Sequence, residues 1–237
     1  MRILSIDTST KHFSLAVSEN EKVLSSKNLK SKKVLSSTII PAIEQVLKKA
    51  GVTLSQIDGF AVGLGPGSFT GLRVGVSTVK GLAYATNKPI VGIPSLDVLA
   101  LNIKRKNAQV CTICDAKRNM VFGCVYDKEG LNIKKKTDYM LTSIQDILQK
   151  ISGDVVFIGD ALNVYKDEIV KEEILRSRSI KSQATFLYEE KEELWYPKAK
   201  NLAALAYKSI REKKFDKVEK ILPVYLYPED CQVRRKQ

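Results

Sequence analysis

Hydrophobic and polar residues alternate with a period of two over three short runs at the start of the chain, RILSID, HFSLAVS and KVLSSKNL. This alternation is typical of strands with one buried face, and the polar residues at 8–11 and 19–22 predict short turns between them. A helical period follows over residues 36–50 and stops at Gly51, a residue common just after a helix. The chain therefore opens with a predicted three-stranded meander and a helix.

Strands and helices alternate in the rest of the chain. We predict strands over residues 57–62 and 89–93, with one helix ending near residue 86 and another beginning near residue 95. The second half repeats this order, with strand patterns over 109–116, 120–128, 131–139 and 154–160 and a helix over 143–151. The remaining predicted elements are helices over 165–176 and 199–213 and a strand over 221–227. The repeated order predicts an internal duplication in an α/β fold of mixed sheets with helices on their faces.

The stretch GLGPGSFTGLRVG, residues 63–75, lies between a predicted strand and a predicted helix, where free backbone N–H groups can bind anions. A Walker A loop ends in Gly-Lys followed by Ser or Thr, and this loop has no lysine at that point. A dinucleotide fingerprint from Gly65 requires glycine where Thr70 stands, and one from Gly63 requires it at Ser68. The residues therefore give only weak support to a phosphate-binding loop.

The helix after this loop has an apolar surface about twice as wide as one core contact needs. One stripe of large apolar residues fits a sheet, and a second stripe contains Gly71 and Gly75. Each glycine inside a helix costs about 1 kcal/mol relative to alanine. Two of them one turn apart form a shallow groove that another backbone can approach.

Two interpretations of this groove stay open, an internal neighbour and a helix of another subunit. The preceding helix also has a broad apolar arc, which favours the second interpretation and a four-helix interface between subunits. The predicted interface residues are Ile39, Ile43, Val46, Leu47, Gly71, Val74, Gly75, Thr78 and Leu82.

The net charge of +13 over 237 residues suits a protein that works near polyanions. The basic residues are spread over clusters at 27–33, 104–106, 134–136 and 234–236, which also fits an ordinary solvated surface. No nucleic-acid recognition module is visible, so we expect any contact to be electrostatic and weaker in high salt.

The cysteines are expected to be reduced, buried thiols. Cys111 and Cys114 lie three residues apart on a predicted strand, which sends their side chains to opposite faces. The sequence has a single histidine, His12, so a zinc site is not favoured. No apolar run approaches the roughly 20 residues that a membrane span needs, and the N-terminus lacks a secretory pattern. We therefore expect a cytoplasmic protein with no membrane partner.

Several short motifs are distributed along the chain: IDTST at 6–10, GPGSFTGLRVG at 65–75, DAKR at 115–118, GDA at 159–161 and PVYL at 223–226. Together they resemble the TsaB (YeaZ) family of bacterial tRNA threonylcarbamoyladenosine biosynthesis proteins. The resemblance implies the duplicated ribonuclease-H-like fold of the actin, Hsp70 and sugar-kinase superfamily. We accordingly expect two lobes. The first comprises residues 1–104 joined by the helix near 198–213, and the smaller second lobe comprises 105–197 with 214–237.

The resemblance also implies a non-catalytic subunit. Proteins of this family are paralogues of TsaD, which transfers threonylcarbamoyl to the adenosine beside the tRNA anticodon, and they hold TsaD through their N-terminal helices. The ATPase TsaE joins the pair. The implied partners are TsaD in a heterodimer, TsaE, a second copy when isolated, and tRNA through the complex. We expect no cofactor bound by this chain alone, with ATP and metal belonging to partner subunits. Ser95 and Leu99 stand where TsaD-like proteins have metal-binding histidines.

Two alternatives stay open. Asp7, with Thr8 and Ser9, matches the first phosphate loop of the superfamily, which leaves a sugar-kinase-like ATPase as a possibility. No second phosphate loop with a paired acid is evident, so we interpret these residues as a vestigial nucleotide loop. A glycoprotease-like peptidase is the other alternative. It is disfavoured because the chain has no HExxH motif and His12 has no evident Ser or Cys partner.

Overall fold

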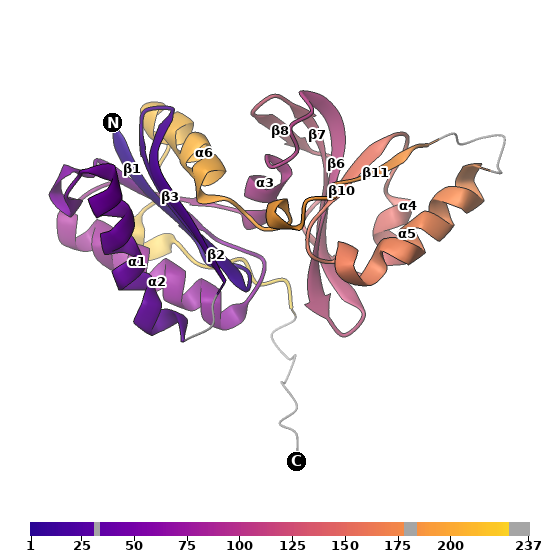
Figure 1. The fold of residues 1–237 in the computed structure, drawn as a ribbon, viewed down its shortest axis with the longest axis horizontal. Coiled ribbons are helices and arrows are strands. Elements are labelled where there is room, and N and C mark those ends of the chain that lie inside the picture. Colours follow the sequence, from indigo (N-terminus) through magenta and orange to yellow (C-terminus); the bar gives the residue numbers. More distant parts are fainter. Residues whose placement is uncertain (31–33, 178–183, 228–237) are drawn as a thin grey trace, which may run out of the picture.

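Two mixed β-sheets with helices on their faces form two lobes that lie side by side (Figure 1). The computed structural model describes residues 1–30, 34–177 and 184–227. Lys32, Lys33, Cys231 and the basic cluster at 234–236 lie outside the described residues.

The first sheet has five strands in the order β3-β2-β1-β4-β5. These strands are β1 (Arg2–Asp7), β2 (His12–Glu19), β3 (Lys22–Lys30), β4 (Gly59–Gly63) and β5 (Ile90–Ile93). β1, β2 and β3 pair antiparallel, which confirms the predicted meander, and β4 and β5 add in parallel beyond β1. Helices connect β3 to β4 and β4 to β5, and the second connection is a crossover between parallel neighbours, which need a long connection.

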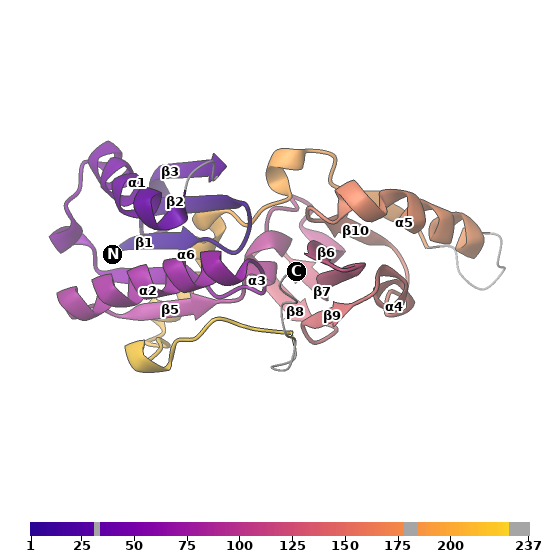
Figure 2. The ribbon, with the colours of Figure 1, turned by 90° about the horizontal axis from the view of Figure 1, so that it is seen from below.

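Helices cover both faces of the first sheet. α1 (Leu35–Ala50) and α2 (Phe69–Thr86) lie side by side on one face, and α6 (Ala199–Arg211) lies on the other (Figures 1 and 2). Alternate residues of β1 supply the two cores, since successive strand side chains point to opposite faces. Leu4 and Ile6 pack with residues of α1 and α2, and Ile3 packs with residues of α6.

The second sheet repeats this topology. Its order is β11-β10-β6-β7-β8, with β9 also paired to β7. Its elements are β6 (Asn107–Lys117), β7 (Met120–Glu129), β8 (Asn132–Lys135), β9 (Met140–Thr142), α4 (Ile144–Gln149), β10 (Val155–Ile158), α5 (Leu162–Ser177) and β11 (Phe186–Tyr188). β6 pairs antiparallel with β7 and parallel with β10, as β1 does with β2 and β4. The shared pattern confirms the duplicated α/β fold.

A short helix, α3 (Ser95–Ala100), packs between the lobes. Its residues Leu96 and Leu99 belong to a core with Cys114 and Phe122 of the second sheet. Cys111 packs in the opposite core, under α4 and α5, so the predicted opposite orientation of the two thiols is confirmed. Short 3₁₀ turns complete the fold at Leu54–Gln56, Glu192–Leu194 and Val218–Lys220.

The predicted strand over 221–227 is wrong. Pro223 has no N–H to donate to a strand ladder, and this segment instead crosses α2 as an irregular strap. The Lys80 ammonium donates a hydrogen bond to the Ile221 carbonyl at 3.0 Å, and the Val224 N–H donates to the Leu64 carbonyl at 2.8 Å. Sequence analysis also missed β11 and β9, which are three-residue strands too short to show a period.

The chain after α6 returns along the first lobe. Asp216 forms a bridge with Ile90 of β5, and Ile221 packs in the core beneath α1 and α2. Leu226 and Tyr227 then pack in the core that α3 shares with the second sheet. Residues 216–221, which we expected in the second lobe, thus contact the first, whereas the predicted division at residue 104 stays a prediction.

Candidate functional site

Asp7, the last residue of β1, lies where the glycine-rich loop meets the start of α3. Its side chain is buried. Oδ1 accepts hydrogen bonds from the Ser9 backbone N–H at 2.9 Å and the Ser9 hydroxyl at 2.6 Å. Oδ2 accepts one from the Ser95 hydroxyl at 2.7 Å, and the same hydroxyl accepts from the Gly65 N–H at 3.0 Å. Groups of the same chain therefore occupy both carboxylate oxygens.

The surroundings of Asp7 do not fit a metal-nucleotide site. Burial raises its pKa above the usual aspartate value, while the hydrogen bonds from Ser9 and Ser95 oppose that shift. Magnesium binds through accessible carboxylate oxygens and keeps several of its waters, which this enclosed carboxylate does not allow. Among the described residues, no group of His, Cys, Asp and Glu side chains is arranged to hold a metal ion.

The glycines of the loop allow it to lie directly on this corner. A Cβ atom built on Gly63 would lie 2.0 Å from Asp7 Oδ2, and one built on Gly67 would lie 2.1 Å from the Ser9 carbonyl oxygen. The Ser68 N–H donates to that same carbonyl oxygen at 2.7 Å. The close approach that these glycines permit is thus to the chain's own residues 7–9, and no bound phosphate is needed to explain it.

Thr8 fills the groove that Gly71 and Gly75 form on α2. A Cβ atom on Gly75 would lie 2.1 Å from Thr8 Oγ1, and one on Gly71 would lie 2.3 Å from the Thr8 carbonyl oxygen. The Thr8 hydroxyl also donates a hydrogen bond to the Gly71 carbonyl at 2.8 Å. The prediction that this groove receives another subunit is therefore wrong. Its occupant is internal, a residue of the loop that follows β1.

The apolar arc predicted on α1 is likewise used inside the molecule. Ile39, Ile43, Val46 and Leu47 are at most 8% exposed, and they pack in the core between α1, α2 and the first sheet. These residues cannot present a surface to a partner, because the sheet already covers them. Of the predicted interface, Val74, Thr78 and Leu82 on α2 are only partly buried, and their role in pairing stays a prediction.

Ser95 and Leu99, at the positions of the TsaD-like histidines, have structural roles. Ser95 connects α3 to Asp7 and Gly65, as described above. Leu99 is fully buried in the core between α3 and the second sheet. Ser95 thus connects α3 to β1 and the glycine-rich loop, and Leu99 packs α3 against the second sheet.

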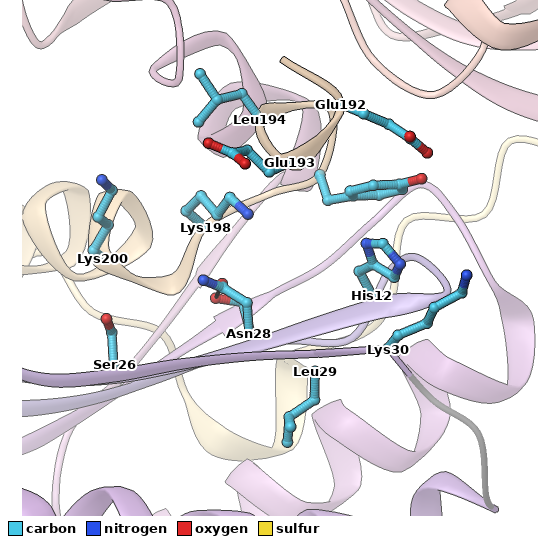
Figure 3. A pocket seen from close by; sticks show the side chains of 12 residues that line it. His12, Ser26, Asn28, Leu29, Lys30, Glu192, Glu193, Leu194, Lys198 and Lys200 are labelled. Atoms are coloured by element: carbon cyan, nitrogen blue, oxygen red, sulfur yellow. Dashed lines mark hydrogen bonds between the residues drawn. The ribbon is translucent and has the colours of Figure 1, made fainter.

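A cleft of about 860 Å³ opens between β2, β3 and residues 192–200 (Figure 3). His12 and Lys30 reach it from the first sheet, and Glu192, Glu193 and Lys198 reach it from the segment that leads into α6. Burial lowers the pKa of His12, and the nearby charges of Lys11, Lys30 and Lys198 lower it further. Sequence analysis missed this cleft because its walls lie far apart in the chain and share no motif.

The described residues contain no helix with both the length and the apolar character that a membrane crossing requires.

Comparison with known proteins identifies the relatives of this chain. The family model of TsaD, tRNA N6-adenosine threonylcarbamoyltransferase, matches residues 22–233. The tRNA threonylcarbamoyladenosine biosynthesis protein TsaB of Escherichia coli is 30% identical over 232 residues, which cover 95% of this chain and 94% of that protein.

Solved structures show the same fold. YeaZ from Pseudomonas aeruginosa superposes with a TM-score of 0.78 at 24% identity, over 95% of this chain and 99% of that one. A ROK hexokinase from Thermus thermophilus has a TM-score of 0.51 at 13% identity, over 90% of this chain and 100% of that one. The second match places the fold among those of sugar kinases.

The contact of Thr8 with α2 can be tested with alanine substitutions. We expect Gly75→Ala and Gly71→Ala each to lower the free energy of unfolding by about 2 kcal/mol or more, because the added methyl group overlaps Thr8. Thr8→Ala removes the oxygen that Gly75→Ala meets, but it leaves the carbonyl that Gly71→Ala meets. Denaturant unfolding should therefore show that Thr8→Ala partly rescues Gly75→Ala and does not rescue Gly71→Ala. Equal rescue of both would contradict this packing.

Asp7→Asn tests the enclosed carboxylate. Because the pKa of Asp7 is higher in the folded state than in the unfolded state, folding favours the protonated acid. The wild type therefore loses stability as pH rises from the unfolded pKa to the folded pKa. Asparagine has no such charge and can still accept from Ser9. We expect the variant to gain stability relative to the wild type as pH rises from 3.8, the ordinary pKa, past the folded pKa. Unfolding curves between pH 3 and pH 7 measure this difference, and a difference that falls with rising pH would oppose the assignment.

Proposed function

The chain belongs to the TsaB (YeaZ) family of tRNA threonylcarbamoyladenosine biosynthesis proteins, and on that premise we propose that it is the non-catalytic subunit that pairs with and activates TsaD. Modification of the adenosine beside the anticodon is then carried out by TsaD, with TsaE recruited to the pair. We further propose that the isolated chain pairs with itself. We also propose that it works in the cytoplasm, where TsaD modifies tRNA.

The observation that carries the non-catalytic role is the enclosed Asp7. In a sugar-kinase-like ATPase this acid would have to face a metal and a nucleotide, whereas here Ser9 and Ser95 occupy its oxygens. The glycine-rich loop covers the same corner, with the Ser68 N–H donating to the Ser9 carbonyl. These contacts support a chain that turns over no ATP, so that the ATP and metal of the reaction belong to its partners.

The outward face of α2 supports pairing through this helix. It carries small uncharged residues that are exposed or partly buried: Thr70, Val74, Ser77, Thr78, Gly81 and Ala85. The basic residues of α2 lie to one side of this face. There the Lys80 ammonium donates a hydrogen bond to the Ile221 carbonyl, and Arg73 Nε donates one to the Tyr225 hydroxyl at 3.2 Å. An exposed helix face without charge resembles the centre of a protein interface more than a solvated surface.

Neighbouring residues extend this surface. Val34 and Ile40, in and beside α1, and Tyr84 on α2 are exposed. α1 and α2 lie side by side on one face of the sheet (Figure 2), so a partner that covers the outward face of α2 can also reach exposed residues of α1. We propose that TsaD, or a second copy of this chain, covers Val74, Thr78, Leu82 and these exposed residues, in place of the buried set that sequence analysis included.

Gly81→Arg tests this surface. A Cβ atom on Gly81 meets nothing within 4 Å, so the side chain has room in the free protein and removing the glycine favours the helix. In a complex, the same side chain would place a charge in an apolar interface. We expect unchanged or higher thermal stability, with a Kd for TsaD raised by about tenfold or more. Threonylcarbamoyl transfer to tRNA by the mixture with TsaD and TsaE should fall accordingly.

Asn163→Arg is the matched control, because it adds the same side chain at an exposed position of α5 in the other lobe. It should leave both the Kd for TsaD and the transfer rate unchanged. If Gly81→Arg binds TsaD as tightly as Asn163→Arg does, the outward face of α2 is not the pairing surface.

A further inference from the structure

We propose that the cleft between β2, β3 and residues 192–200 binds a nucleoside phosphate, with lysines holding the phosphate and a carboxylate holding the ribose. This inference goes beyond the proposed function and does not depend on it. It also departs from the expectation that no small molecule binds to this chain alone. The cleft has the size of a small-molecule site, more lysines than carboxylates in its lining, and a buried histidine nitrogen without a hydrogen-bond partner among the described residues.

The cleft has the dimensions of a small-molecule site. Its volume of about 860 Å³ lies within the range of 300–1,000 Å³ typical of such pockets. Its floor is the face of β2 and β3 that α6 leaves uncovered, with Ser26 and Asn28 on β3. Figure 3 shows Asn28 opposite Lys198 and Ser26 opposite Lys200 across the opening. The walls therefore combine polar groups from strands and from an interlobe segment.

Lysines outnumber carboxylates in the lining of this cleft, which also contains Glu192 and Glu193. Lys30, Lys198 and Lys200 line it, and Lys11 lies beside its inner end, with its ammonium 5.6 Å from the centroid of the Tyr196 ring. Within the described part of the chain, none of these lysines forms an ion pair. Several unpaired cations around one opening favour an anion there, and phosphate is the common biological anion that lysine binds.

An unpartnered polar atom lies in the wall of the same cleft. Nε2 of His12 is buried and, among the described residues, has no hydrogen-bond partner. The His12 ring packs against Tyr196, with the two ring centroids 3.9 Å apart, and Tyr196 is 1% exposed. A buried polar atom without a partner lowers stability, and a ligand group that forms a hydrogen bond with it would recover that loss.

Glu192 and Glu193 favour a nucleotide over a bare anion. They line the cleft on the side of residues 192–200 and would repel a second phosphate group. A carboxylate accepts hydrogen bonds from the hydroxyl groups of ribose, as the acidic residue of dinucleotide-binding folds does. The lysines would bind a single phosphate group, and a glutamate would bind the ribose. The enclosed Asp7 is not available to this ligand, so we expect binding without phosphoryl transfer.

His12 reports directly on this site, because it is the only histidine of the chain. Nuclear magnetic resonance of its imidazole can be followed while the full chain is titrated with 5′-AMP, inorganic phosphate, adenosine or tRNA. We expect 5′-AMP to shift the resonance in a saturable way. The bound phosphate should also raise the pKa of His12, since it offsets the positive charges of Lys11, Lys30 and Lys198 that now lower it. Adenosine alone, which lacks the phosphate, should bind far more weakly.

Charge variants separate a site from a general attraction. The double variant Lys30→Gln, Lys198→Gln should raise the Kd for 5′-AMP by about tenfold or more. The control Lys48→Gln, Lys49→Gln removes the same charge from the exposed end of α1 and should leave the Kd unchanged.

The titration with tRNA distinguishes a free nucleotide from a nucleotide within an RNA strand. If the His12 resonance responds to tRNA and not to 5′-AMP, the ligand is a nucleotide within an RNA strand, and the site stands. The proposal is overturned if neither shifts the resonance, if inorganic phosphate binds as tightly as 5′-AMP, or if the lysine variants bind like their control. Because none of these variants touches the outward face of α2, binding to TsaD is expected to persist in all of them, and failure here leaves the proposed function untouched.

Discussion

The structure depends on how residues 7–9 are held between the glycine-rich loop, α2 and α3. Asp7 accepts from Ser9 and Ser95, Thr8 occupies the groove of Gly71 and Gly75, and the Ser9 carbonyl accepts from Ser68. These contacts join β1, the start of α2 and the start of α3 at one point. A carboxylate buried among hydroxyl and amide donors is tolerated only because every oxygen has a partner. The arrangement encloses the Asp7 carboxylate among hydrogen-bond donors of the same chain.

Much of the fold follows from the sequence because its strands and helices are strongly periodic. The meander of β1, β2 and β3 and the helix α1 were predicted nearly to the residue, as was the end of α2. The strap over 221–227 was not, because an alternating apolar run looks like a strand although Pro223 and the surface of α2 prevent it from joining a sheet. Short strands such as β11 contain too few residues to show any period.

The candidate site was less predictable, for a physical reason that the glycines illustrate. Two glycines one turn apart show that something approaches α2 closely, but they do not show what approaches. The occupant is Thr8, whose distance from Gly71 and Gly75 in sequence is large and whose contact depends on the path of the loop after β1. The same holds for the cleft, where His12 meets Tyr196 only once both lobes are folded.

The first lobe thus has two distinct regions. Around residues 7–9 the chain's own groups fill the space, whereas the uncharged outward face of α2 is the surface that we propose for TsaD. Hydrogen exchange of the chain, alone and mixed with TsaD, tests this separation most directly. We expect binding to slow exchange in α1 and α2, with the amides of α5 and β11 in the second lobe unchanged. Slower exchange confined to the second lobe, with α2 unaffected, would contradict the account.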